Sequence, residues 1–421
     1  MQHVIDISSD RLRLEEGRWQ PLARRLQTAG LGAIVVALAI GAFGLESLLR
    51  AYVMNLCYYV SIALGALFFV LLQHLTRAGW SVVVRRLAEL FTTAFPLLAL
   101  LAAPAVLLIL TGGLLGFPAA VHQVYPWTDA QYVAKEPLLQ AKAPYLNAGF
   151  FAVRLAVYFA AWVGLSAWLL SRSLEQDRTG DPAITRGLGK WSAPAMYLFA
   201  LTLTFFAFDV IMSLAPSWYS TIFGVYYFAG AMLSFCALLA LTVHLLQRAG
   251  YMVRAVSVEH MHDVGKLVFA FVVFWSYIAF SQYMLIWYGN IPEETAWYAV
   301  RQTGGWIALS LLLLFGHFML PFLMLISRAP KRRLQVLAGL ACYVLVIHWL
   351  DIYYLVMPPY YFKLSDPGTA PFDLLGLLLA GLLAVGMGAL LAGYVLRRMA
   401  MHPLIPERDP RLTESLAFTN I

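Results

Sequence analysis

The sequence is poor in charged residues and in cysteine. Only 12% of its 421 residues are charged, whereas about a quarter of a typical soluble domain is. Its three cysteines lie far apart within apolar segments, and no CxxC, CxxCH or cysteine–histidine ligand spacing occurs. We therefore expect no iron–sulfur cluster, metal or haem on this chain. Cys57, Cys236 and Cys342 are interpreted as small apolar packing residues.

Nucleotide motifs are also missing, since there is neither a Walker lysine loop nor a GxGxxG after a strand. ATP hydrolysis is therefore not expected. Residues 1–25 are polar and lack the apolar run and small-residue cleavage site of a signal peptide. The tail at 401–421 is short and polar, and we expect it to lie on a partner or to be disordered.

Long apolar segments fill most of the chain, and hydrophobic residues make up 61% of it. Ten windows have about the ~20 residues that a helix needs to cross a bilayer. The sequence therefore predicts an all-α integral membrane protein with one transmembrane domain at 26–400. The windows fall near 27–46, 51–75, 87–111, 146–170, 191–214, 219–246, 267–288, 302–326, 334–356 and 374–396.

The net charge of +7 is a matter of topology and does not indicate nucleic-acid binding. Of the 29 lysines and arginines, 23 lie in the two terminal segments and in the loops after spans 2, 4, 6 and 8. Because cytoplasmic loops are enriched in basic residues, both termini are predicted to be cytoplasmic. One arginine, Arg154, lies inside a span. The opposite loops hold the other five, which are Arg50, Lys135, Lys142, Arg301 and Lys363.

Several ionisable side chains fall deep inside the spans, where a charge costs about 3 kcal/mol or more. His348 and Asp351 are three residues apart and share one helix face. Histidine suits a proton relay because it titrates near neutral pH. Polar groups at different depths, with His348 between them, predict two half-channels for protons. The predicted proton path comprises Asp209, His317, His348 and Asp351, with Asp263 and Lys266 near the cytoplasmic entry.

The same residues allow structural interpretations. Arg154 can form a buried ion pair with Asp209 or with Asp351 that fixes the helix register. Glu89, Asp263 and Lys266 lie near span ends, where side chains reach water.

Two further features concern His317. A b-type haem between His317 and His348 is a third alternative, although their estimated depths differ by roughly 6 Å. Pro321 lies four residues after His317 and cannot donate to its carbonyl group, so a local helix distortion is expected there.

Four stretches resemble the membrane subunits of the NrfD and polysulfide reductase family. Within that family they are most similar to the second such subunit (ActF) of alternative complex III, a bacterial quinol:cytochrome c oxidoreductase. The similarity covers about residues 25–400. The stretches are FDVIMSLAPSWYSTIFGVYYFAG at 208–230, DVGKLVFA at 263–270, QYMLIWYGNIPEE at 282–294 and HWLDIYYLVMP at 348–358.

The resemblance implies two four-helix bundles with flanking helices, in the bacterial inner membrane. It implies a subunit without a redox cofactor of its own, in a complex that oxidises quinol near the outer face. The expected partners are a paralogous membrane subunit, an iron–sulfur subunit and multihaem cytochromes that carry haem c. Relatives often have an acidic residue and a histidine where this chain has Ala215 and Ser217, and the motifs do not define a quinone site.

Three functions follow as hypotheses. The first is a proton-conducting or quinol-binding subunit of a respiratory complex. The second is a proton-coupled secondary transporter that acts alone, which interrupted helices in matching halves would favour. The third is a structural anchor for peripheral subunits. Copurification with haem c proteins separates the first from the second, and mutation of the buried charges separates the first from the third.

The basic asymmetry gives a testable topology. With the native cysteines replaced, a cysteine at Thr179 is expected to react with a membrane-impermeant reagent only from the cytoplasmic side. A cysteine at Lys135 is expected to react only from the opposite side. The reverse pattern would contradict the predicted orientation.

Overall fold

The computed structural model describes residues 5–111, 118–358 and 373–420, and every regular element within them is helical. Ten stretches are long and apolar enough to cross a membrane, which confirms the predicted all-α membrane fold. Lys363, one of the predicted outer basic residues, lies outside the described residues. The ten stretches are Glu16–Gly41, Leu45–Leu75, Val82–Thr111, Ala148–Thr179, Pro182–Leu214, Phe223–Arg248, Val258–Gly289, Trp306–Leu325, Leu334–Val356 and Leu374–Met401.

Seven of the ten spans are single α-helices and three are composite. The single helices are α1 (Glu16–Gly41), α2 (Leu45–Leu75), α8 (Ala148–Thr179), α10 (Phe223–Arg248), α11 (Val258–Gly289), α16 (Leu334–Val356) and α17 (Leu374–Met401). The composite spans are α3 (Val82–Thr92) with α4 (Phe95–Thr111), α9 (Pro182–Phe206) with η2 (Ala207–Ile211) and η3 (Met212–Leu214), and α13 (Trp306–Leu312) with η4 (Leu313–Met319) and α14 (Leu320–Leu325).

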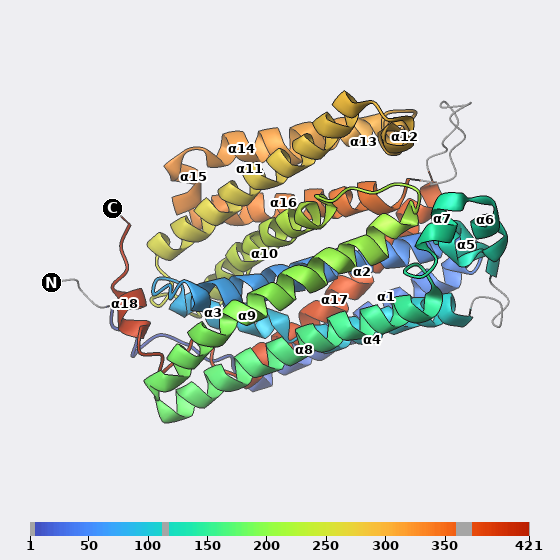
Figure 1. Cartoon of the computed structure of the whole chain (residues 1–421). Helices are drawn as coiled ribbons and strands as arrows, with labels where there is room; N and C mark the ends of the chain where they lie inside the picture. The colour runs from blue at the N-terminus through green and yellow to red at the C-terminus, as the bar shows by residue number, and fades with distance from the viewer. Residues whose placement is uncertain (1–4, 112–117, 359–372, 421) are drawn as a thin grey trace.

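The spans pack as two groups of four with a flanking pair, as expected (Figure 1). The first bundle combines α2, α8, α9 and the α3–α4 span. The second combines α10, α11, α16 and the α13–α14 span. Helices α2 and α10 pack against each other where the bundles meet, and α1 lies along α17 on the flank.

Glycines permit close contacts between these helices, as small residues commonly do in membrane proteins. A Cβ atom on Gly65 of α2 would lie 2.2 Å from the carbonyl oxygen of Ala231 on α10. On α1, a Cβ atom at Gly30 would lie 2.6 Å from the carbonyl oxygen of Gly386 on α17. Any larger residue at these two positions would push the helices apart.

Short helices cap the two ends of the molecule. We call the end that holds α15 (Arg328–Arg332) and α18 (Leu412–Leu416) the terminal end, because the described chain both starts and finishes there (Figure 1). The opposite end holds five short elements. They are α5 (Pro118–Val124), η1 (Pro126–Thr128), α6 (Ala130–Lys135), α7 (Pro137–Lys142) and α12 (Pro292–Arg301).

The expectation that the C-terminal tail lies on a partner or is disordered is wrong for the described residues. The backbone N–H of Leu404 donates to the carbonyl of Leu12 at 2.8 Å. The Ser415 hydroxyl donates to the carbonyl of Trp80 at 2.7 Å. The tail is therefore fastened across the terminal end of the same chain.

A buried ion network holds this tail. Arg85 contacts Glu89 at 3.3 Å and Asp409 of the tail at 2.5 Å. Arg86 contacts Glu89 at 2.9 Å and Asp177 of α8 at 2.8 Å. Its place near a span end suggests that Glu89 reaches water, but this residue is only 1% exposed. Its charge is compensated by two guanidinium groups, as burial of a carboxylate requires.

Arg301 at the opposite end is a buried cation without a carboxylate partner among the described residues. Burial lowers its pKa to about 10, so it remains charged at neutral pH. Its guanidinium donates to the carbonyls of Tyr354 and Leu355, in the last turn of α16, and to that of Trp297. Because carbonyl groups at a helix C-terminus are partly negative, they stabilise the cation.

Candidate functional site

Three of the predicted proton-path residues meet in the second bundle. His348 and Asp351 lie one turn apart on α16, with His348 Nδ1 3.7 Å from Asp351 Oδ2. His317 approaches from η4, and its ring centroid is 6.3 Å from that of His348. One ligand atom from each residue lies within 4.8 Å of the other two. We call His317, His348 and Asp351 the histidine cluster.

Local sequence explains how His317 enters this cluster. Pro321 provides no N–H for the carbonyl of His317, and the helix there widens into the π-helical segment η4. The predicted distortion is therefore confirmed. Tyr343 of α16 donates to the Gly316 carbonyl at 2.9 Å, which ties the distorted turn to the helix that carries His348.

Close packing places His348 as well. A Cβ atom on Gly230 of α10 would lie 2.5 Å from His348 Cε1, so the imidazole needs glycine at that position. His348 Nε2 forms a hydrogen bond of 3.0 Å with the Ser61 hydroxyl of α2. The ring therefore bridges α16 to the two helices that join the bundles.

Asp351 is held by two donors from neighbouring helices. The Tyr226 hydroxyl of α10 donates to Oδ1 at 2.5 Å, and Trp275 Nε1 of α11 donates to Oδ2 at 3.0 Å. The Trp275 ring also lies 3.7 Å from the ring of His317, centroid to centroid. Ser61, Tyr226 and Trp275 were not among the predicted site residues, because no spacing within the α16 segment indicates partners on other helices.

The cluster is buried, and some of its polar atoms have no partner among the described residues. All three side chains are at most 1% exposed. Among the described residues, neither nitrogen of His317 has a hydrogen-bond partner, and His348 Nδ1 has none. Buried polar atoms normally have partners, so three such nitrogens in one place mark a site where a proton, a water molecule or an ion can bind.

This geometry disfavours the haem alternative. A carboxylate oxygen of Asp351 lies within 4.8 Å of a nitrogen on each histidine. A haem ligated by His317 and His348 would place its macrocycle between the two nitrogens, in the space that the carboxylate borders. The Trp275 ring also packs directly on His317, which leaves less space beside that ring.

Asp209 belongs to a separate cluster in the first bundle. Arg154 Nε and Nη2 donate to its two carboxylate oxygens at 2.8 and 3.0 Å, and Tyr158 donates at 2.7 Å. Of the two predicted partners for Arg154, the structure therefore selects Asp209. Asp209 lies in the π-helical segment η2, where the hydroxyl of Ser213 donates to its carbonyl.

Further along α8 from Arg154, hydrogen bonds continue on one buried face of the helix. Trp162 donates to Thr202 at 2.9 Å and Ser166 donates to Thr92 at 2.7 Å. Residues 154, 158, 162 and 166 are spaced by four, which is the signal in the sequence that places them on one face. No hydrogen bond or ion pair between the described residues joins Asp209 to the histidine cluster.

Asp263 and Lys266 lie near the terminal end of α11 and form an ion pair with each other. Lys266 also donates to the side chain of Asn420 in the tail at 2.9 Å, and its side chain is 48% exposed. Lys266 is therefore a surface residue at a span end, as the alternative interpretation stated, whereas the Asp263 side chain is only 16% exposed. Neither belongs to the histidine cluster.

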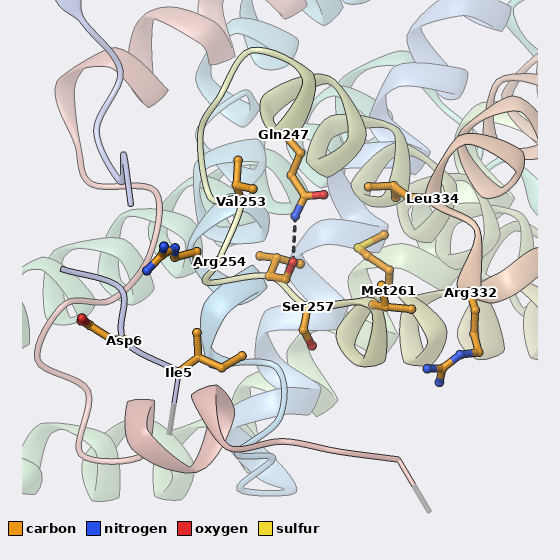
Figure 2. Close-up of a pocket in the computed structure, with 11 residues that line it drawn as sticks. Ile5, Asp6, Gln247, Val253, Arg254, Ser257, Met261, Arg332 and Leu334 are labelled. Carbon is orange, nitrogen blue, oxygen red and sulfur yellow. Dashed lines mark hydrogen bonds between the residues drawn. The ribbon is translucent and has the colours of Figure 1, made fainter. Parts of the chain in front are cut away.

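A hollow of about 490 Å³ also lies at the terminal end, between the start of α11 and the preceding loop (Figure 2). Arg254 and Arg332 stand on opposite sides of it. Arg332 is bound to Glu259 at 2.6 and 2.8 Å. Since the two cations do not converge, this hollow does not form an anion site.

No family model matches the chain, and a search of curated proteins finds no relative. The family resemblance therefore rests on the four quoted stretches.

The pairing of Arg154 with Asp209 predicts a coupled stability effect. Arg154→Met is expected to destabilise the protein by about 3–5 kcal/mol, because it leaves a carboxylate buried without its cation. The double variant Arg154→Met/Asp209→Leu is expected to recover most of that loss. Thermal unfolding in detergent measures both effects.

The exposed pair of Arg172 and Glu175 supplies the control, since Glu175→Gln is expected to change stability by about 1 kcal/mol or less. A single Arg154→Met variant as stable as the wild type would contradict the structural role of the pair.

Proposed function

We propose that this chain is a membrane subunit of a bacterial respiratory quinol:electron-acceptor oxidoreductase and that its second bundle conducts protons. The observation that carries the proton role is the histidine cluster, where three nitrogens without a partner in the described part of the chain lie beside a buried carboxylate. The link to quinol oxidation rests on the motif resemblance. Ionisable residues in a membrane interior commonly mark ion pathways or proton relays.

The chemistry of the cluster suits a relay. A neutral imidazole can accept a proton at one nitrogen and release another proton from its second nitrogen. His348 lies between Asp351 and Ser61, with one ring nitrogen toward each. The separations of 3.7 to 4.8 Å exceed a direct hydrogen bond, so transfer requires a bridging water or a rotation of the His317 ring.

The remaining predicted residues take different parts in this proposal. Asp209 is neutralised by Arg154, so we assign it to the stability of the first bundle. Asp263 and Lys266 stand at the terminal end, where they can deliver protons toward the second bundle. Orientation of that end toward the cytoplasm is part of the proposal and rests on the excess of basic residues there.

The partners and cofactors of the proposal follow from the resemblance alone. The chain would assemble with a paralogous membrane subunit, an iron–sulfur subunit and multihaem cytochromes c, which carry the redox centres. Quinone would bind this chain or its paralogue. A transporter that acts alone and a purely structural anchor are the competing functions.

Replacement of Asp351 tests the proton role. Asp351→Asn keeps the shape and the acceptor for Tyr226 but removes the titratable group. We expect coupled quinol turnover to fall about a hundredfold, as when a positioned acid–base group is lost, with assembly intact. The measurement is quinol oxidation and medium acidification by the reconstituted complex, isolated through a tag on this chain.

Glu175→Gln, in an exposed ion pair with Arg172, is the control for general charge effects and is expected to leave turnover unchanged. If Asp351→Asn changes neither the proton yield nor the rate, the proton role is wrong and the structural anchor is favoured. Isolation of the chain without any haem c protein would instead favour the transporter.

A further inference from the structure

The histidine cluster also has the composition of a metal site. Two imidazoles and one carboxylate are a donor set that binds Zn²⁺ in proteins, with a fourth position left open. A short metal motif in the sequence would not reveal this set, because its donors come from two successive spans and His317 lies 31 residues before His348. His317 lies on η4, whereas His348 and Asp351 lie on α16.

The donor atoms are available to an ion. Neither His317 nitrogen is hydrogen-bonded to a described residue, and the same holds for His348 Nδ1. The atom beside His348 Nδ1 is Asp351 Oδ2, at 3.7 Å. Each histidine therefore offers a nitrogen without first breaking a hydrogen bond to another side chain.

The surroundings orient two of the ligands. Ser61 holds the far nitrogen of His348 at 3.0 Å, and Tyr226 holds the far oxygen of Asp351 at 2.5 Å. Hydrogen bonds of this kind to the remote atoms of ligands fix ring and carboxylate orientation in metal sites.

The spacing requires a modest contraction. Donor atoms within 4.8 Å of one another must approach to about 3.3 Å to bind one ion at bond lengths of roughly 2.0–2.1 Å. His317 is the ligand that no hydrogen bond between described residues holds in place, and its helix is already distorted, although the Trp275 ring packs against it with 3.7 Å between the ring centroids. Metal binding would require its ring to shift against Trp275 toward the other two ligands.

We infer that His317, His348 and Asp351 form a binding site for a divalent transition-metal ion of the Zn²⁺ class. The ion would be coordinated through one nitrogen of each histidine and one oxygen of Asp351. The two positive charges would be partly balanced by the carboxylate, which leaves the site with a net charge of +1. A bound ion occupies the nitrogens that a proton relay would use, so metal binding and proton transfer exclude each other. The site itself does not depend on the proposed function.

The test measures metal content and coordination. Because the cluster is buried, Zn²⁺ is supplied during synthesis, and the purified full chain is washed with a chelator before elemental analysis. Wild type is expected to retain near-stoichiometric Zn²⁺. X-ray absorption of the wild-type protein is expected to show nitrogen and oxygen ligands at about 2.0–2.1 Å, including imidazole, and no sulfur.

Variants provide the matched comparison. His348→Gln and Asp351→Asn are expected to lose the ion, whereas His74→Gln is expected to retain it. His74 is likewise a buried histidine with an unpartnered nitrogen among the described residues, but it lies outside the cluster.

Zinc at the level of the wash blank in the wild type would overturn the inference, as would sulfur ligands in its spectrum. Retention by His348→Gln together with loss from His74→Gln would also overturn it. None of these outcomes depends on quinol turnover, so they leave the proton role to its own test.

Discussion

Compensation of buried charge without water is the constraint on which this structure depends. A membrane span offers no solvent to an ionised side chain, so each buried charge needs a partner from a neighbouring helix. In the first bundle, Arg154 neutralises Asp209, Tyr158 donates to the same carboxylate, and the pair joins α8 to η2. At the terminal end, Arg85 and Arg86 do the same for three carboxylates and hold the tail in place.

The second bundle meets the constraint differently. Among the described residues, Asp351 has two hydrogen-bond donors but no permanent cation, and the histidines beside it retain unpartnered nitrogens. A site that is incompletely satisfied can change its protonation or take up an ion, whereas a closed ion pair resists both. In the proposed function, the ionisable residues of the first bundle are structural and those of the second conduct protons, although the sequence presents them alike.

Much of this arrangement could be predicted from the sequence. Hydropathy identifies the ten spans because each must satisfy its backbone within the bilayer. Pro321 predicts the distortion at His317, since the missing donor is local. Partners on other helices could not be predicted. Tyr226 and Trp275 reach Asp351 only because α10 and α11 pack beside α16. The presence of Ser213 alone does not predict the π-helical segment at Asp209.

The central claim is that Asp351 changes its protonation during turnover. Infrared difference spectroscopy of the complex, recorded on addition of quinol, observes the carboxyl group directly. The account predicts a carboxylic-acid band that changes on quinol addition, is absent in Asp351→Asn and persists in Asp209→Asn. A band that persists in Asp351→Asn and disappears in Asp209→Asn would contradict it and transfer the proton role to the first bundle.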